Sequence, residues 1–270
     1  MKSNFMAEHR PFLIYVHVEK AGGITINNML HHYLWSYISP RPRYGEQFEK
    51  RDLEIIQRFY PFKIKGIGGH RISPTEVYAE NQFRFSMIRN PVKRYISHLN
   101  WQINKMGIDH TLESFLENKY FQNFQTFRLT RSRNFKEAQE IISKNYNFIG
   151  ILEEFDCSVE LLSQLYFNDV NYLRYEKKNI TTKSNVTYTI DDLPNNVMDE
   201  IRSKNQVDID IYNWVYDDLY LPIKESLSER KVDKPFLQTP LITKLKRKTS
   251  NAYVGRILQP LFQKRVEYGY

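Results

Sequence analysis

The fold of this chain is decided by FLIYVHV, residues 12–18, and by the loop that follows, Lys20-Ala21-Gly22-Gly23-Ile24-Thr25. Residues 12–16 form a continuous apolar run, which is typical of a strand buried on both faces of a parallel sheet. After the glycines, apolar side chains recur at the spacing of one helical face, at Ile26, Met29, Leu30, Tyr33 and Leu34. The order strand, loop, helix predicts an α/β fold with a central parallel sheet flanked by helices.

The loop has the residue types of a phosphate-binding site. Gly22 and Gly23 lack a Cβ, so the backbone can turn tightly and approach an anion closely. Lys20 adds a point charge, Thr25 adds a hydroxyl, and backbone N–H groups at the helix start are aimed at the same point. An ordinary turn between a strand and a helix, with a solvated lysine, would use the same residue types.

Two familiar nucleotide-binding loops do not fit this stretch. The loop of nucleoside triphosphatases reads G-x-x-x-x-G-K-[ST], with the lysine after the glycines, whereas Lys20 precedes Gly22 and Gly23. The dinucleotide fingerprint G-x-G-x-x-G is also absent, because the two glycines are adjacent and no third one follows. Both nucleotide-binding interpretations therefore lose support.

A second segment has the same strand-to-helix pattern. Residues 83–88, FRFSMI, predict a strand, and Arg89 follows at its end. Asn90 and Pro91 are an N-cap and a first helical residue, so a helix is predicted to begin there. Arg89 can make a forked contact to a phosphate, and Ser97, two helical turns further on, can donate a hydroxyl to the same group. A basic, solvated helix start is the alternative explanation.

Together, the two segments resemble the sulfotransferases that use 3'-phosphoadenosine 5'-phosphosulfate (PAPS), in particular the branch of the heparan sulfate 2-O-sulfotransferases and their bacterial relatives. Residues 17–25, HVEKAGGIT, are similar to the family loop H-x-P-K-T-G-G-T-[ST], which cradles the 5'-phosphosulfate. Residues 89–97, RNPVKRYIS, match the motif R-[DN]-P-x-x-R-x-x-S, which binds the 3'-phosphate. The resemblance implies a sulfotransferase fold with a P-loop-like donor site at Lys20, Ala21, Gly22, Gly23, Ile24, Thr25, Arg89 and Ser97.

Two residues depart from the family pattern. Glu19 stands where many relatives have Pro, and Ile24 stands where many have a Thr that would face phosphate. Thr25 must then supply the hydroxyl, while backbone N–H groups at a helix N-terminus already carry much of an anion site. We therefore expect altered donor affinity rather than loss of function.

The chain between the two motifs contains the candidate base, His70. Residues 62–67 are predicted to form a strand that is broken by Gly68 and Gly69, and the capping sequence SPTE, residues 73–76, predicts a helix just after His70. Open α/β sheets bind ligands outside the carboxyl ends of their strands, so His70 and the two motifs are predicted to converge. In the heparan sulfate 2-O branch a G-H element carries the catalytic base, which implies that role for His70.

An imidazole suits this chemistry. Sulfuryl transfer requires an acceptor hydroxyl to lose its proton as the SO₃ group moves in line, and histidine, which titrates near neutral pH, can take that proton. Lys20 would offset the charge that develops on the bridging oxygen of the leaving phosphate, and no metal is required. The alternative is a structural histidine in a non-catalytic nucleotide- or glycan-binding protein of the same fold. His31 and His32 are adjacent on a helix and point about 100° apart, which favours packing roles over metal binding.

Three further segments are similar to the family; a scaffold role is predicted for residues 147–162, and no role is assigned to residues 123–129. Residues 123–129, NFQTFRL, fall in a helical region near the family's cleft, and residues 147–162 predict a strand that passes into a helix. Residues 207–220 predict the closing helix. The resemblance covers approximately residues 10–222.

The chain divides into a predicted sulfotransferase domain, residues 1–222, and a basic C-terminal extension, residues 223–270. The compact basic run KLKRK, residues 244–248, is followed by apolar side chains at near-helical spacing. We expect the extension to dock on the domain. A peripheral membrane contact and an oligomer contact are the alternatives.

Composition agrees with a single enzyme. A chain of 270 residues with 41% hydrophobic content can bury one substantial core, and no stretch approaches the about 20 apolar residues of a membrane span. The polar N-terminus and the single cysteine, Cys157, lead us to expect a cytoplasmic location. The formal charge of +8 suits an anionic donor, but it fits nucleic acid or an anionic membrane equally well. By resemblance, the expected partner is a saccharide or glycoconjugate acceptor and not nucleic acid.

Overall fold

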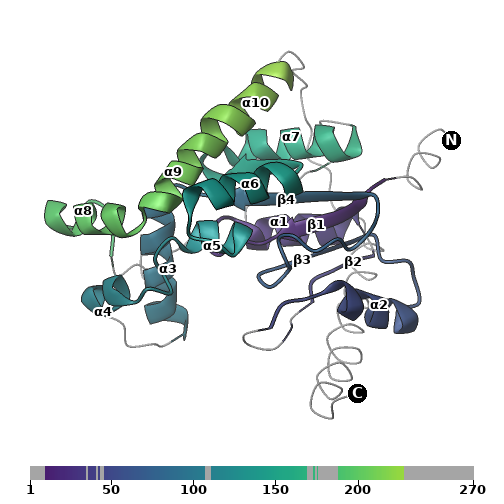
Figure 1. Cartoon of the computed structure of the whole chain (residues 1–270), viewed down its shortest axis with the longest axis horizontal. Coiled ribbons are helices and arrows are strands. Elements are labelled where there is room, and N and C mark those ends of the chain that lie inside the picture. Colours follow the sequence, from purple (N-terminus) through teal and green to yellow (C-terminus); the bar gives the residue numbers. More distant parts are fainter. Residues whose placement is uncertain are drawn as a thin grey trace, which may run out of the picture.

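A parallel sheet of five strands forms the centre of the computed structural model, in the order β2-β3-β1-β4-β5. The structure describes residues 10–227, apart from 35, 41, 43–45, 107–110, 169–172, 174 and 176–187. Helices flank the sheet (Figure 1), so the predicted α/β architecture is confirmed. The strands are β1 (Phe12–Val16), β2 (Tyr37–Ile38), β3 (Gly66–Gly69), β4 (Gln82–Ile88) and β5 (Phe148–Ile151).

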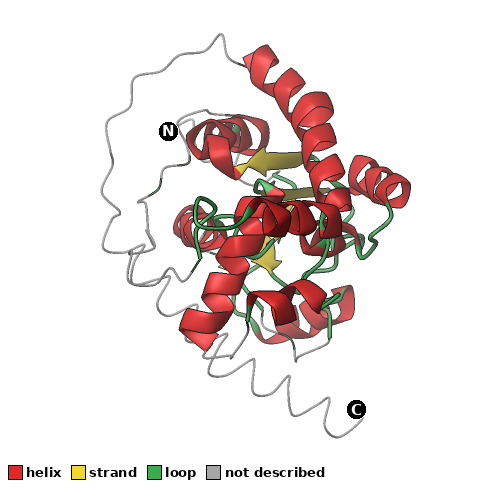
Figure 2. Ribbon diagram, turned by 90° about the vertical axis from the view of Figure 1, so that its left-hand side faces the viewer, coloured by secondary structure: helices red, strands yellow, loops and turns green. Residues whose placement is uncertain are grey.

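The helices lie around the strands, as the views in Figures 1 and 2 show. In Figure 1, α2 lies beside the β2 edge of the sheet, while α6, α7 and α10 lie toward the β4 side. The α-helices are α1 (Gly23–Tyr33), α2 (Lys50–Phe59), α3 (Pro91–Met106), α4 (Leu112–Glu117), α5 (Phe124–Thr130), α6 (Phe135–Asn145), α7 (Phe155–Phe167), α8 (Asn195–Lys204), α9 (Gln206–Trp214) and α10 (Leu221–Leu227). A 3₁₀ turn, η1 (Leu152–Glu154), and a π-helical turn, η3 (Val215–Tyr220), complete the set.

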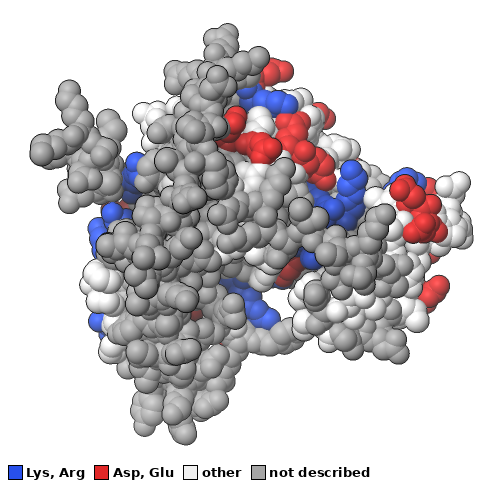
Figure 3. Space-filling model, turned by 180° about the vertical axis from the view of Figure 1, so that it is seen from behind, with Lys and Arg blue, Asp and Glu red and all other residues white. Residues whose placement is uncertain are grey.

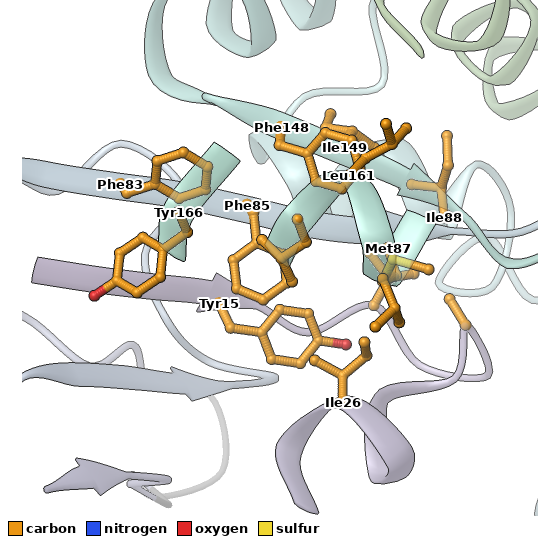
Figure 4. Close-up of a cluster of buried hydrophobic side chains, with 14 of the residues drawn as sticks. Tyr15, Ile26, Phe83, Phe85, Met87, Ile88, Phe148, Ile149, Leu161 and Tyr166 are labelled. Carbon is orange, nitrogen blue, oxygen red and sulfur yellow. The ribbon is translucent and has the colours of Figure 1, made fainter. Parts of the chain in front are cut away.

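Strand β1 is buried on both faces because its side chains alternate between two apolar clusters. Leu13 and Tyr15 pack with α1 and α7, whereas Ile14 and Val16 pack with α2. Figure 4 shows Tyr15 beside Phe85 of β4, with ring centroids 4.8 Å apart. Each fully buried side chain of this size contributes about 1.5–3 kcal/mol to stability. This burial anchors the strand that leads into the loop at Lys20.

The prediction that Gly68 and Gly69 break the third strand is wrong. The strand runs from Gly66 to Gly69, so these glycines are part of the sheet rather than its interruption. A Cβ on Gly68 would overlap the Tyr37 side chain, and a Cβ on Gly66 would lie 2.9 Å from the Cβ of Leu13. Glycine is required here because neighbouring side chains occupy the space beside β3.

The helix expected after His70 is also absent, since residues 71–81 form turns, bends and irregular chain, with one isolated bridge between Ile72 and Phe48. The Ser73 hydroxyl does accept a hydrogen bond from the Glu76 N–H, at 3.3 Å, as a helix cap would. The backbone then leaves the helical path because the Tyr78 N–H donates to the Gln82 side chain at 3.0 Å. Glu76 O accepts from Arg84 in β4. Contacts with β4 therefore replace the expected helical turn.

The helix predicted after Arg89 is confirmed as α3. Asn90 Oδ1 accepts a hydrogen bond from the Lys93 N–H at 3.1 Å, which is the expected N-cap. Residues 147–162 form β5, η1 and the start of α7, and residues 207–220 form α9 and η3, as the scaffold prediction required.

The predicted boundary between residues 222 and 223 falls within α10, which continues to Leu227. The rest of the C-terminal extension, including the basic run at residues 244–248, lies outside the described residues, so its docking stays a prediction. In the described part of the chain, no helix has both the length and the apolar character that crossing a membrane requires.

Candidate functional site

Three neighbouring strands end together at one edge of the sheet. In the register of β1 with its neighbours, Val16 lies opposite Gly69 of β3 and Ser86 of β4. The chain therefore leaves β3 at His70 and leaves β4 at Arg89, on either side of the loop that leaves β1. The structure thus brings the three predicted site segments together.

The loop between β1 and α1 has the conformation that its glycines permit. Gly22 has φ 78° and is the N-cap residue of α1, without a side-chain cap. Lys20 also has a positive φ, 68°, which costs a non-glycine residue about 1–2 kcal/mol. Within the described residues, the backbone N–H groups of Gly22, Gly23 and Ile24 have no hydrogen-bond acceptor. These N–H groups form the positive end of a helix, where an anion binds favourably.

Lys20 and Arg89 bring positive charge to this loop. Arg89 Nη1 donates to the Lys20 carbonyl at 3.3 Å, which helps to hold the left-handed turn. Burial and the neighbouring Arg89 lower the pKa of Lys20, and burial lowers the pKa of Arg89, opposed by Glu153. Neither side chain forms an ion pair with a carboxylate in the part of the chain that the structure describes. Two neighbouring cations that form no ion pair within the described residues favour binding of an anion.

Gln125 fixes the backbone of Arg89 through two hydrogen bonds. Its Oε1 accepts from the Arg89 N–H, and its Nε2 donates to the Arg89 carbonyl, both at 3.0 Å. The Asp208 carboxylate in turn accepts from the N–H groups of Gln125 and Thr126, at 3.1 and 2.7 Å. Segment 123–129 therefore positions Arg89, a role that its sequence alone does not reveal.

Ser97 lies half-buried on α3, as predicted from its spacing to Arg89. Among the described residues, no hydrogen bond joins its hydroxyl to Arg89 or to the loop. The other arginine of the motif, Arg94, is fully buried, and its Nη1 lies 3.3 Å from His98 Nδ1. Arg94 is thus part of the interior, while Arg89 is the arginine at the loop.

His70 has one buried and one accessible ring edge. Its Nδ1 lies 3.2 Å from the His17 carbonyl oxygen and 3.4 Å from Glu19 Oε1. Both neighbours are acceptors, so Nδ1 must carry the proton and Nε2 keeps its lone pair. The side chain is 46% exposed, and its ring stacks on His17 with centroids 3.9 Å apart.

Glu19 belongs to the candidate site, although in the sequence it stands out only as a departure from the family pattern. Its carboxylate accepts from Arg128 Nε at 2.9 Å and from Arg128 Nη2. Burial alone would raise the pKa of Glu19, but hydrogen bonds and charge from His70 and Arg128 hold that pKa well below its usual range. The pairing crosses 109 residues of sequence, so no local signal could have revealed it.

Gly23 has a steric role at the start of α1. A Cβ on this residue would overlap the imidazole of His17. Burial and the neighbouring His70 keep the pKa of His17 well below its ordinary value, and Asn27 Nδ2 lies 3.3 Å from His17 Nδ1. His17 is therefore a neutral ring that fills the space between α1 and His70.

The family model described as the sulfotransferase family matches residues 3–217 of the 270 residues. The chain belongs to the sulfotransferase family. The match spans the loop at residues 17–25, His70, Arg89 and Ser97, together with the supporting Gln125. A comparison with curated proteins finds no match.

A cleft opens beside His70 in this sulfotransferase, with a volume of about 410 Å³. Helix α1 supplies one wall, and the segment after β2 supplies another. The lining residues are His17, Ile24, Asn27, Asn28, His31, Ser39, Pro40, Pro42, Gly69, His70 and Arg71. Ile24 is 56% exposed, so an apolar side chain stands where the family pattern places a hydroxyl. His31 belongs to this wall through its contact with Ser39 Oγ at 3.0 Å.

Proposed function

We propose that this protein transfers a sulfuryl group from PAPS to a hydroxyl of a saccharide, with His70 as general base. Membership of the sulfotransferase family supports sulfuryl transfer in general. The observation that carries the finer assignment is that the loop after β1 is contacted from both sides. His70 Nδ1 lies against the His17 carbonyl, and Arg89 Nη1 lies against the Lys20 carbonyl.

The donor fits the Arg89 side of this arrangement. The N–H groups of Gly22, Gly23 and Ile24 and the ammonium of Lys20 suit the 5'-phosphosulfate, with Thr25 as the hydroxyl donor. Arg89 is suited to a second phosphate because its guanidinium can bind it with two parallel hydrogen bonds. Ser97 would donate to the same 3'-phosphate.

In the proposed reaction, His70 Nε2 takes the proton of the acceptor hydroxyl as the acceptor oxygen bonds to sulfur. The bond between sulfur and the bridging oxygen of the 5'-phosphate breaks, and its electron pair stays on that oxygen. Lys20 stabilises the charge that develops there, a preorganised contribution that does not require the site to rearrange. His70 then releases its proton to water.

The acceptor fits the cleft on the His70 side. Its volume is within the about 300–1,000 Å³ of small-molecule sites, and its walls carry the amides of Asn27 and Asn28 and the hydroxyl of Ser39. Arg71 adds a cation that suits an acidic group on the saccharide. Figure 3 shows both basic and acidic side chains among the described residues of the face that it draws.

The proposal is tested by incubating the protein with ³⁵S-labelled PAPS and a panel of uronate-containing and neutral oligosaccharides. Calorimetric titration with adenosine 3',5'-bisphosphate runs in parallel. We expect bisphosphate binding and transfer of label to at least one saccharide. Binding without transfer to any hydroxyl acceptor would favour a non-catalytic nucleotide-binding protein, and no binding would reject the donor site.

A further inference from the structure

We propose that Glu19 is a positioning residue for His70, and that Arg128 keeps the Glu19 carboxylate ionised and fixed. This inference rests on the proposed function, because it concerns the general base of that reaction. Glu19 occupies the loop position at which the sequence departs from the family pattern, so the arrangement is a property of this chain's own residues.

Both carboxylate oxygens of Glu19 have defined partners. Oε1 faces His70 Nδ1 at 3.4 Å, and both carboxylate oxygens accept hydrogen bonds from the Arg128 guanidinium. The second neighbour of His70 Nδ1 is a carbonyl oxygen, at 3.2 Å, so among the described residues no donor competes for this edge of the ring. The imidazole is therefore held in the tautomer whose Nε2 can accept a proton.

Glu19 is unsuited to be the base itself. A carboxylate that receives two guanidinium N–H groups and faces an imidazole N–H favours its ionised form, which holds a proton poorly. Its side chain is 19% exposed, against 46% for His70. The accessible lone pair that can reach an acceptor is that of His70.

The charges around His70 come from three segments. Glu19 and the stacked His17 lie on the loop side, Arg128 reaches in from α5 through Glu19, and Arg71 follows His70 in the chain and lines the same cleft. His17 contributes no charge while it is neutral. When His70 takes a proton, the carboxylate of Glu19 is thus the nearest negative group among the described residues, and it stabilises the imidazolium.

Arg128 also offsets the negative charge of Glu19 close to the proposed donor site. A carboxylate next to an anion-binding loop would repel the negatively charged phosphosulfate of the donor. Arg128 is buried at 9% exposure and also lies over the Phe124 ring, 5.0 Å from its centroid. Its bidentate pairing with Glu19 offsets the negative charge at short range and holds both side chains in one geometry.

The test compares two variants that should change the acid limb of the pH–rate profile in opposite directions. Glu19→Gln removes the negative charge, so the midpoint of the limb should move to lower pH. The Gln amide can also donate to Nδ1, which favours the wrong tautomer, and kcat should fall about 10²- to 10⁴-fold. Arg128→Met keeps the packing on Phe124 but exposes His70 to the full charge of Glu19, so the midpoint should move to higher pH and donor affinity should fall.

Glu154→Gln is the matched control. Glu154 is a similarly exposed carboxylate, at 24%, and it pairs with Lys224 at 2.6 Å outside the cleft. We expect this variant to keep the wild-type acid limb and donor affinity. If Glu19→Gln behaves like Glu154→Gln, or if both site variants move the limb in the same direction, the inference is overturned.

A measurement on the free protein separates this inference from the proposed function. Nitrogen-15 NMR of the histidine side chains reports the tautomer of His70 and its titration midpoint without turnover. Glu19→Gln should lower that midpoint and increase the Nε2-protonated tautomer at high pH. An unchanged His70 signal overturns the positioning role. A changed signal in a protein that transfers no label rejects the proposed reaction instead.

Discussion

His70 is the residue on which the proposed chemistry depends, because its two ring nitrogens have different surroundings. Nδ1 faces oxygen acceptors, whereas nearly half of the side chain is exposed at the cleft. Arg89 has the complementary position on the other side of the loop. Under the proposed function, single substitutions at these two residues should separate turnover from donor binding.

Replacing His70 with Ala should lower kcat by about 10²- to 10⁴-fold, the range for loss of a positioned general base. Donor affinity, measured by calorimetry with adenosine 3',5'-bisphosphate, should change little because the donor groups lie on the Arg89 side. His32→Ala, on the same helix as the cleft wall but outside the lining, is the control. A wild-type rate for His70→Ala on the true acceptor would assign the base to another residue.

Replacing Arg89 with Ala should weaken binding of adenosine 3',5'-bisphosphate by about 1.5–3 kcal/mol, because a charge-assisted contact to one phosphate is lost. Binding of adenosine 5'-phosphate should change much less. Lys93→Ala removes an exposed cation from the same helix and controls for general charge. Equal losses for both nucleotides would show that Arg89 does not distinguish the 3'-phosphate.

At the scale of elements, the site depends on how closely α1 and α5 approach the ends of the strands. Helix α1 can pack over His17 only because Gly23 has no side chain. Helix α5 is held by Asp208 of α9, which satisfies two N–H groups of its first turn. Each of these packing contacts can be tested by a small change.

Gly23→Ala should destabilise the protein by about 1–3 kcal/mol, the usual cost of overpacking, because the new methyl group overlaps the buried His17 ring. Gly69→Ala is the matched control at the end of β3, since its nearest neighbour would be the Pro40 carbonyl at an ordinary 3.4 Å. Urea unfolding measures both. Equal stability of the two variants would mean that His17 can move away without cost.

Asp208→Ala should cost about 2–4 kcal/mol of stability, because it leaves the buried N–H groups of Gln125 and Thr126 without acceptors. It should also weaken bisphosphate binding, since Gln125 would no longer hold the Arg89 backbone. Asp199→Ala, which breaks an exposed pair with Arg202 in α8, should change neither quantity. A destabilised Asp208→Ala protein that binds the bisphosphate with full affinity would show that α5 does not influence donor binding.

At the scale of the whole molecule, the acid stability should reflect two buried histidines. Burial and neighbouring charge lower the pKa of His17 well below its ordinary value, and burial and Arg94 lower the pKa of His98 to about 3. Both rings are neutral when folded but take up protons when unfolded below pH about 6.5. The unfolded state then binds more protons than the folded state, so stability falls as pH decreases.

Urea unfolding between pH 6 and 4.5 should therefore show stability falling by about 1.4 kcal/mol per pH unit for each of these histidines. The paired Glu19 acts at lower pH, since its depressed pKa contributes stability above the unfolded value of about 4.3 and loses it below. His98→Gln should reduce the dependence of stability on pH by about 1.4 kcal/mol per pH unit, the contribution of one histidine. A slope that stays the same in this variant would show that His98 is not neutral in the folded protein.

The sequence by itself determined several local elements of this protein and the segments of its candidate site. The buried strand, the glycine loop, the amphipathic α1 and the Asn90 cap each depend on residues close together in the chain, so periodicity and capping chemistry were sufficient to predict them. Convergence of Lys20, His70 and Arg89 also followed, because parallel strands end at one edge.

Only the tertiary structure decided what lies beside those residues. The glycines of β3 are part of the sheet, because Tyr37 and Leu13 occupy the space that a side chain on Gly68 or Gly66 would need. Glu19 is only a departure from the family pattern in the sequence, but in the structure Arg128, 109 residues away, holds it against His70. The physical reason is that such contacts depend on strand order and helix packing, which place distant residues together without leaving a periodic signal in the sequence.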